Sequence, residues 1–277
     1  MSFAPVVPIG GYAGWGFLKR TIDSQKAAFE AAPALQHDEA YFCEKIGSIK
    51  TAEDLVSDRR LLGVALGAYG LDADINNKYF IRKVLEDGTL TEDALANRLA
   101  DKQYLALSSA FGFGDFDTPS TQLSDFADKI LTAYKTRQFE AAVGEQNSDM
   151  RLALNAEREL GKLAGRSISA DAKWFTIMGS APLRQVFETA FGLPGSFAAI
   201  DLDQQLGILK DKAEQFFGDA GVAQFSDPER VEALVKRFMV RSDASGSFAP
   251  TVRGVGALQL LQAADRSSAV SILSLLA

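Results

Sequence analysis

The sequence predicts an all-α protein in which two related multi-helix units are joined by a long helical segment. The string alanine–aromatic–glycine–apolar occurs three times, around Gly70, Gly112 and Gly192, and each copy closes a stretch with helical apolar spacing. A glycine just past a helix end can adopt the left-handed conformation, and the next apolar residue folds back onto the last turn. Only eight prolines interrupt the 277 residues, and no segment has the alternation of a convincing strand. The three glycines are therefore predicted helix stops.

The first part of the chain is expected to contain a flexible arm and a first helical unit. Residues 1–16 are rich in glycine and proline, which favours an arm, and helix signals run from near Trp15 to a stop before Pro33. Thr51 to Asp54 resembles a capping box, with aspartate in place of the usual glutamate. The helices that follow in the unit of residues 17–118 are expected at about 59–69, 77–85, 92–99 and 102–111.

The connecting segment, residues 119–166, holds a continuous helical pattern from Thr121 to Ala164. Gly144 weakens that pattern by roughly 1 kcal/mol relative to alanine. One long helix, and two helices separated between Gly144 and Asp149, are both compatible with the apolar spacing. The sequence leaves these two alternatives open.

A second set of helices is expected in the unit of residues 167–241. These helices cover about 170–178, 183–191, 202–217 and 228–240. The last of them opens with a predicted capping box from Ser226 to Glu229, with a proline in its first turn. Residues 242–277 are expected to form a Ser/Gly linker from Ser242 to Thr251, followed by a C-terminal helical tail.

The two units resemble each other in the spacing of their helix stops. Leu61 lies seven positions before the first alanine–aromatic–glycine string, and Leu183 lies seven positions before the third. This spacing predicts an internal duplication, in which each unit is a helix, a capped stop and two further helices. The alternative is that helix stops of this kind recur by chance in helical proteins.

Composition excludes several classes of function. The formal charge of −7 makes a nucleic-acid backbone or an anionic membrane surface an unfavourable partner. No segment is long and apolar enough to span a bilayer. The single cysteine, Cys43, rules out an internal disulfide and a multi-cysteine zinc site. We therefore expect a soluble protein with no nucleic-acid partner and no membrane insertion.

Side chains that could carry chemistry are few. His37 is the single histidine and is expected in an exposed loop after Pro33, without a partner that could activate it. Cys43 is expected on the apolar side of a helix beside Phe42, where a thiol behaves as a small hydrophobe. The segment Asp72–Asn76 begins like a calcium loop, but the loop lacks glycine at its sixth position and glutamate at its twelfth. No catalytic, cofactor-binding or metal-ligating residue is predicted.

The string Asp58-Arg59-Arg60 could form an anion-binding site. Its position at a helix start instead favours a cap made by Asp58 and surface or interhelical pairing of the two arginines. Gly63 and Gly67 follow on the same helix, without the lysine and the preceding strand of a phosphate loop. Small residues on one helix face favour close packing of a second helix.

The apolar ends of the chain are the candidate partner-binding segments. Trp15 and Phe17 stand near the N-terminus, and Leu258, Leu261 and Leu273 stand in the C-terminal tail. If these apolar side chains were exposed, they would favour non-specific association. Each end is therefore expected to dock on the chain's own body or on a partner. Docking on the chain itself is the simpler expectation, because the entropy cost of loop closure grows slowly with length.

Five segments carry a resemblance to a known family. They are Trp15–Thr21, Asp58–Leu66, Phe80–Glu86, Ala96–Asp101 and Arg151–Glu159. Together they resemble the alphaproteobacterial proteins grouped as domain of unknown function 1217, over nearly the whole chain. The resemblance implies an all-helical protein of a kind often encoded among flagellar genes. It implies no catalytic residues, because the family has none to carry over.

This resemblance leads us to expect a non-enzymatic flagellar structural or assembly-associated protein that acts through helix-mediated protein–protein contacts. Its expected partners are flagellar components or further copies of the chain, and no cofactor is expected. The alternative is a cytoplasmic regulatory or small-ligand-binding helical module, with a ligand between the two units. Residues 1–18 lack the basic region of a cleavable signal. The expected location is the cytoplasm, or the flagellum if the protein is exported without such a signal.

Overall fold

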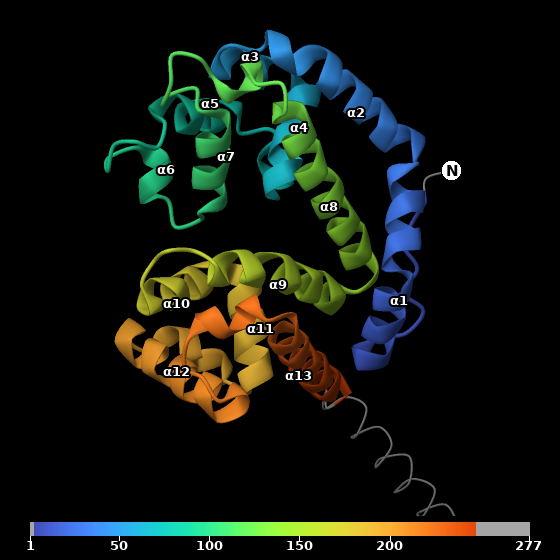
Figure 1. The fold of residues 1–277 in the computed structure, drawn as a ribbon, viewed down its shortest axis with the longest axis vertical. Helices are drawn as coiled ribbons and strands as arrows, with labels where there is room; N and C mark the ends of the chain where they lie inside the picture. Colours follow the sequence, from blue (N-terminus) through green and yellow to red (C-terminus); the bar gives the residue numbers. More distant parts are fainter. Residues whose placement is uncertain (1–2, 248–277) are drawn as a thin grey trace, which may run out of the picture.

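The structure, a computed structural model, describes residues 3–247 and is all-α within that range (Figure 1). The predicted fold class is confirmed, because no strand occurs among the described residues. The α-helices are α1 (Gly11–Glu30), α2 (Pro33–Lys45), α3 (Ala52–Ser57), α4 (Arg59–Tyr69), α5 (Lys78–Asp87), α6 (Leu95–Arg98), α7 (Gln103–Phe111), α8 (Phe126–Gln146), α9 (Ser148–Ala164), α10 (Ala170–Gly179), α11 (Ala181–Phe191), α12 (Leu202–Phe217) and α13 (Pro228–Ser247). Short 3₁₀ helices cover Ile46–Ser48, Asp72–Asp74, Ser120–Gln122, Gly195–Ala199 and Val222–Ser226.

The helices pack around two hydrophobic cores. One core joins side chains of α2 to α8, among them Phe42, Leu62 and Phe111. The other joins side chains of α9 to α13, among them Trp174 and Phe187. Figure 1 shows the two corresponding bodies, which are connected where α8 meets α9. We call them the α2–α8 body and the α9–α13 body. The internal duplication stays a prediction.

Helix α1 belongs to the second core although it comes first in the chain. Trp15 and Leu18 are fully buried in the core that α9–α13 form with the end of α8. The Trp15 indole Nε1 also donates to Glu232 Oε2 on α13 at 3.4 Å. Trp15 is therefore a core residue, as expected if the apolar end docks on the chain's own body, and its role as a partner contact stays a prediction. Phe17 is half-buried, and its role stays a prediction.

The N-terminal arm is shorter than predicted, because α1 begins at Gly11 rather than near Trp15. The glycines in this stretch favour an arm in the sequence, but one of them has a packing role instead. A Cβ on Gly14 would stand 1.9 Å from the carbonyl oxygen of Ile9. The arm therefore folds back over the first turn of α1, which requires glycine there.

The three predicted stop glycines each follow the last residue of a helix, at positive φ. The φ angles are 74° at Gly70, 67° at Gly112 and 67° at Gly192. After α4, the N–H of Leu71 donates to Leu66 O at 2.9 Å and that of Gly70 to Gly67 O at 3.2 Å, which is the Schellman arrangement. The α11 end repeats it, whereas α7 ends with the single bond of an αL motif.

The connecting segment forms two helices. Asn147 separates α8 from α9, with φ −152° and ψ 106°, and its side chain accepts the N–H of Met150 at 3.0 Å. The break lies inside the window between Gly144 and Asp149 that the sequence left open. A Cβ on Gly144 would stand 2.5 Å from Arg151 Cδ, so the glycine permits the close turn between the helices.

Two capping boxes were predicted at helix starts, one before α3 and one before α13. The capping box at Thr51 and Asp54 is confirmed, with both reciprocal bonds formed. The cap of α13 is wrong by one residue, because Asp227 Oδ1 accepts the N–H of Glu229 at 2.9 Å while the Ser226 hydroxyl donates to Ala223 O. Asp227 takes the cap because Ser226 still belongs to the preceding 3₁₀ helix.

Helix α13 continues to Ser247, so the predicted linker does not begin at Ser242. The Ser242 hydroxyl donates to Asp149 Oδ2 at 2.5 Å, an anchor to α9 that local composition does not reveal. The rest of that linker, the helical tail and the candidate residues Leu258, Leu261 and Leu273 lie outside the described residues. None of the described helices has the length and hydropathy needed to cross a membrane.

Candidate functional site

A groove of about 270 Å³ lies between α2, α4 and α8 of the α2–α8 body. Both apolar and polar side chains line it, as in many binding sites for small molecules. The lining residues are Asp38, Arg59, Arg60, Gly63, Val64, Leu66, Asp72, Ile75, Tyr134 and Gln138. The string Asp58-Arg59-Arg60, considered above as an anion site, therefore stands at the edge of a real concavity.

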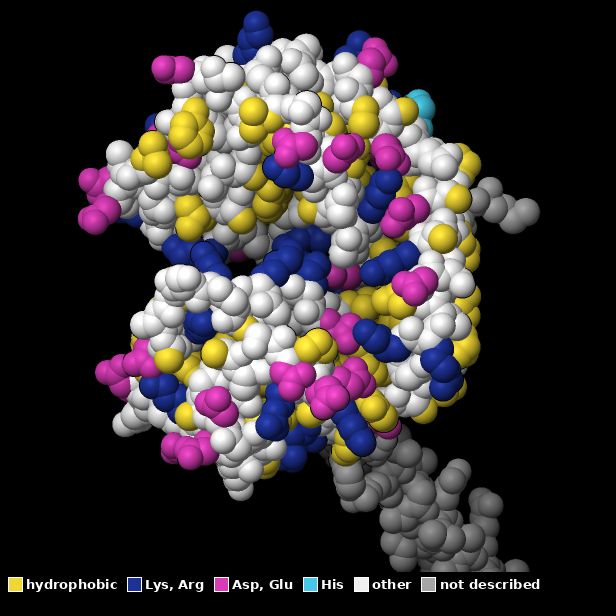
Figure 2. Space-filling model, in the orientation of Figure 1, with side chains coloured by type: hydrophobic (Ala, Val, Ile, Leu, Met, Phe, Trp, Pro, Cys, Tyr) yellow, Lys and Arg dark blue, Asp and Glu magenta, His cyan; other side chains and the backbone are white. Residues whose placement is uncertain are grey.

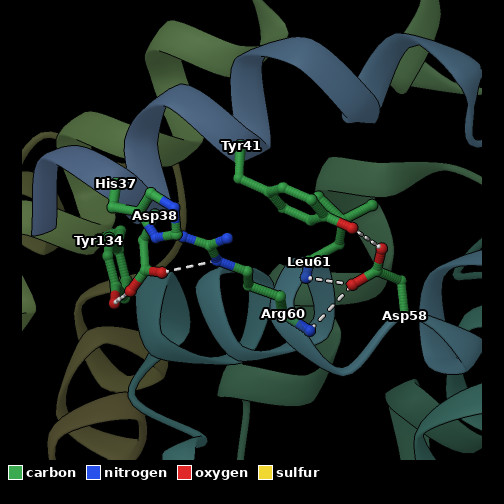
Figure 3. A network of polar contacts seen from close by, with 7 residues as sticks. All are labelled: His37, Asp38, Tyr41, Asp58, Arg60, Leu61 and Tyr134. Atoms are coloured by element: carbon green, nitrogen blue, oxygen red, sulfur yellow. Dashed lines mark hydrogen bonds and ion pairs between the residues drawn. The ribbon is translucent and has the colours of Figure 1, made fainter. Parts of the chain in front are cut away.

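The start of α4 is fixed by Asp58. Its carboxylate accepts the N–H groups of Arg60 at 2.9 Å and Leu61 at 3.1 Å, and the Tyr41 hydroxyl donates to it at 2.7 Å (Figure 3). Burial raises the pKa of Asp58, but the three donors and the nearby Arg60 charge outweigh it, and the net shift is downward. Asp58 is the predicted cap of α4. Its contact with Tyr41 on α2 also positions α4 against that helix.

The Arg60 guanidinium is held by α2 on several sides. Its Nε donates to Asp38 Oδ1 at 2.9 Å, and its carbon lies 4.5 Å from the centre of the Tyr41 ring. Figure 3 shows His37 beside the same guanidinium, and Arg60 Nη2 contacts His37 Nδ1. His37 lies within α2, so its predicted loop position is wrong. Pro33 opens that helix as its first residue rather than interrupting it.

The opposite wall of the groove comes from α8. The Tyr134 hydroxyl donates to Asp38 Oδ2 at 3.4 Å, and Gln138 Nε2 donates to Asp72 Oδ1 at 2.8 Å. Burial is the main cause that raises the pKa of Tyr134 to about 12, and the Asp38 carboxylate adds to it. At the rim, Arg59 is exposed and donates to Asn76 Oδ1 at 3.0 Å. The groove thus has one exposed guanidinium at its entrance.

Two glycines of α4 shape the groove differently. A Cβ on Gly67 would stand 2.7 Å from the Tyr134 ring, so this glycine permits α4 and α8 to pack closely, as the sequence predicts. A Cβ on Gly63 would meet only Ile75 Cδ1, at 4.0 Å. Gly63 therefore borders open space, and a larger side chain there would fill the groove.

The other candidate residues lie away from the groove or serve the fold. Cys43 is exposed on α2, so its predicted apolar position is wrong, because α2 turns Phe42 and not Cys43 into the core. The Asp74 carboxylate accepts hydrogen bonds from the Tyr104 hydroxyl at 2.5 Å and from Asn77 Nδ2 at 2.6 Å. These bonds fix the segment that resembled a calcium loop as a turn. No group of three or more metal-ligating side chains occurs between residues 3 and 247.

Sequence reasoning missed three residues of the groove. Asp38 lies one turn before Tyr41 on α2, and Tyr134 and Gln138 lie one turn apart on α8. Polar residues three or four positions apart within an apolar helical pattern share one helix face. That spacing was the sequence signal that could have indicated these groove residues. Their meeting with α4 depends on the packing of three helices, which no single stretch of sequence contains.

The fold and the groove define the class of this protein: an all-α protein of two helical bodies with a polar groove beside α4. The chain belongs to the family described as "Protein of unknown function (DUF1217)", which matches residues 68–231. A crystal structure of a protein from Agrobacterium tumefaciens is similar at 26% sequence identity, with a TM-score of 0.70. The match covers 87% of this chain and 98% of that one. No curated protein matches the chain.

Proposed function

We propose that this protein is a non-enzymatic, flagellum-associated structural or assembly protein that binds other proteins through its helices. The observation that carries the proposal is the groove beside α4. Its inner charges are already paired between helices, as Arg60 is with Asp38, while Arg59 stays exposed at the rim. A preformed concavity with fixed walls suits recognition of a partner side chain, because little ordering entropy is lost on binding.

The flagellar setting rests on the family. The resemblance described above associates this family with flagellar genes of alphaproteobacteria, and that association concerns a process rather than a chemical step. Proteins of the flagellum, or further copies of this chain, are the proposed partners. The proposed location is the cytoplasm, or the flagellum after export without a cleavable signal.

A clean deletion strain tests the proposal. We expect fewer filaments or hook–basal bodies by electron microscopy and reduced swimming, both restored by the wild-type gene. Complementation with Gly63→Leu, which fills the groove, is expected to fail. Gly63→Ala is the matched control and is expected to restore motility, because its added methyl group meets only Ile75 at van der Waals distance.

Two outcomes contradict the proposal at different points, and a third moves the groove test to another variant. Normal swimming and normal numbers of structures in the deletion strain rule out an assembly role. Full complementation by Gly63→Leu rules out the groove as the binding surface. Loss of folding in purified Gly63→Leu, read by circular dichroism, transfers the groove test to Arg59→Glu, whose side chain is exposed at the rim.

The groove volume also favours a second function, a small-ligand-binding cytoplasmic module. A cavity of about 270 Å³ is close to the lower end of the size range of small-molecule sites. This function predicts a ligand whose addition raises the Tm of the wild-type protein but not of Gly63→Leu, because binding to the native state stabilises it. It also predicts normal flagella in the deletion strain, which separates it from the first proposal.

A further inference from the structure

Basic side chains gather where the two bodies face each other. Figure 2 shows Lys and Arg side chains at the hollow between the bodies, on a protein with a formal charge of −7. Arg137 on α8 lies against the end of α4, with its Nη1 2.5 Å from the point where a Cβ of Gly70 would stand. Its Nη2 lies 3.6 Å from Glu159 Oε1 on α9. Arg137 therefore touches both bodies.

The ion pairs around Arg137 involve two carboxylates in the neighbourhood of three cations. Arg158 on α9 forms a bidentate ion pair with Glu140 on α8. Its Nε donates to Oε1 at 2.7 Å and its Nη2 donates to Oε2 at 3.0 Å. Arg158 also contacts Glu159, which it shares with Arg137. Lys162, one turn further along α9, has no ion pair within residues 3–247. Three cations thus face the two carboxylates of these ion pairs, and the Asp72 carboxylate also acts on Arg137.

These cations repel one another, and the two arginines among them are poorly hydrated. The side chains of Arg137 and Arg158 are 19% and 14% exposed. Burial, and then the charge of Arg158, lowers the pKa of Arg137 to about 10, although nearby acidic and phenolic groups act in the opposite direction. Burial, Arg158 and Arg137 also lower the pKa of Lys162. An anion bound at this point relieves that repulsion.

A half-buried amide side chain, that of Gln103, lies near the Arg137 guanidinium. Gln103 is the first residue of α7, and its Oε1 stands 3.1 Å from the position of a Gly70 Cβ. That oxygen is buried and has no hydrogen-bond partner. Rotation of the amide by half a turn presents its N–H₂ group there instead. The start of α7 adds the positive end of a helix dipole.

We propose that Arg137, Arg158 and Lys162 bind a small molecule through a phosphate group, with the Gln103 amide as an additional donor. Arginine forks match the oxygens of phosphate, and a lysine adds a mobile point charge. The net negative charge of the whole protein opposes long polyanions such as nucleic acid. The site therefore suits a compact anion that enters the hollow between the bodies and contacts helices of both.

Calorimetric titration of the full-length protein with pyrophosphate tests this proposal, with sodium chloride at matched ionic strength as the reference. We expect saturable binding to the wild type. Lys162→Gln is expected to weaken it about tenfold, which is the loss of one charged contact. Arg137→Gln is expected to weaken it further. Lys129→Gln is the matched control, because Lys129 is exposed on α8 and pairs with Asp125, and its affinity should stay within about twofold of wild type.

Either of two results overturns the proposal: no saturable heat with the wild type, or equal affinity of the wild type and Lys162→Gln. Lys162 is exposed, so its substitution leaves the core intact, which circular dichroism checks. That variant decides the outcome even where Arg137→Gln unfolds. The titration does not involve the groove beside α4, so its result is independent of the flagellar proposal.

Discussion

At the residue scale, Gly63 and Gly67 of α4 are chemically identical but lie in different surroundings. Gly67 faces α8, where a Cβ would stand 2.7 Å from Tyr134 Cε2 and 3.0 Å from Gln138 Nε2. Gly63 faces the open groove. The same added methyl group therefore meets a packed ring at one position and free space at the other.

We expect Gly63→Ala to stabilise the protein by about 0.5–1 kcal/mol, because alanine lowers the backbone entropy cost of the helix. We expect Gly67→Ala to destabilise it, because displacement of a packed ring costs about 1–3 kcal/mol and exceeds that gain. Urea unfolding followed by circular dichroism measures both. Equal stabilities of the two variants would contradict the close contact between α4 and α8.

At the element scale, α4 begins at a carboxylate whose protonation state matters. The ionised Asp58 accepts two backbone N–H groups and the Tyr41 hydroxyl. Its pKa is lowered in the folded protein, despite burial, so the folded state favours the charged form. A carboxyl group with a lowered folded pKa stabilises the fold fully above its unfolded pKa of about 3.9 and loses that contribution as the pH falls through the folded value.

Replacement Asp58→Asn should therefore reduce the pH dependence of stability in the acid range. Asparagine keeps a cap for α4, because it is as good an N-cap as aspartate, but it does not titrate. Urea unfolding between about pH 2 and pH 6 measures the slope. Asp211→Asn on α12 is the control, since that side chain is exposed. An Asp58→Asn slope equal to that of the control would show that this carboxylate does not contribute.

The elements also show which features the sequence contains locally. Helix stops and caps were predictable because their hydrogen bonds join residues within five positions, as at Leu71 and Leu66. The extension of α13 was not, because Ser242 is anchored by Asp149 on another helix. Of the groove, the cap at Asp58 was predicted, whereas Asp38 and the α8 residues meet α4 only in the folded chain.

At the scale of the whole molecule, the first helix of the chain completes the last core. Trp15 and Leu18 are fully buried against α9–α13, although those helices begin more than a hundred residues later. A sequence pattern indicates that such residues are apolar, but it does not show which helices they pack against. The same long-range contact explains why an apolar N-terminus, predicted as a candidate partner-binding segment, is occupied in part by the chain itself.

The arm before α1 is held by two glutamines from different helices. The N–H of Val6 donates to Gln25 Oε1 at 2.6 Å, and Gln25 Nε2 returns a bond to Val6 O at 3.1 Å. Gln146, the last residue of α8, accepts the N–H of Val7 at 3.2 Å and donates to Pro5 O. These amides supply the partners that a sheet would otherwise give to extended backbone. The arm thus connects α1 to the junction of α8 and α9.

The double variant Gln25→Ala, Gln146→Ala should release the arm while the cores stay folded. Each backbone bond lost is worth about 1 kcal/mol, so the amides of Val6 and Val7 are expected to exchange with solvent about fivefold faster. Hydrogen exchange measured by mass spectrometry on the N-terminal peptide tests this, with Gln36→Ala on the exposed side of α2 as the control. Unchanged exchange would mean that Val7, which packs against the second core, holds the arm by apolar contact instead. In that case the two glutamines only determine how the arm is positioned along α1 and α8.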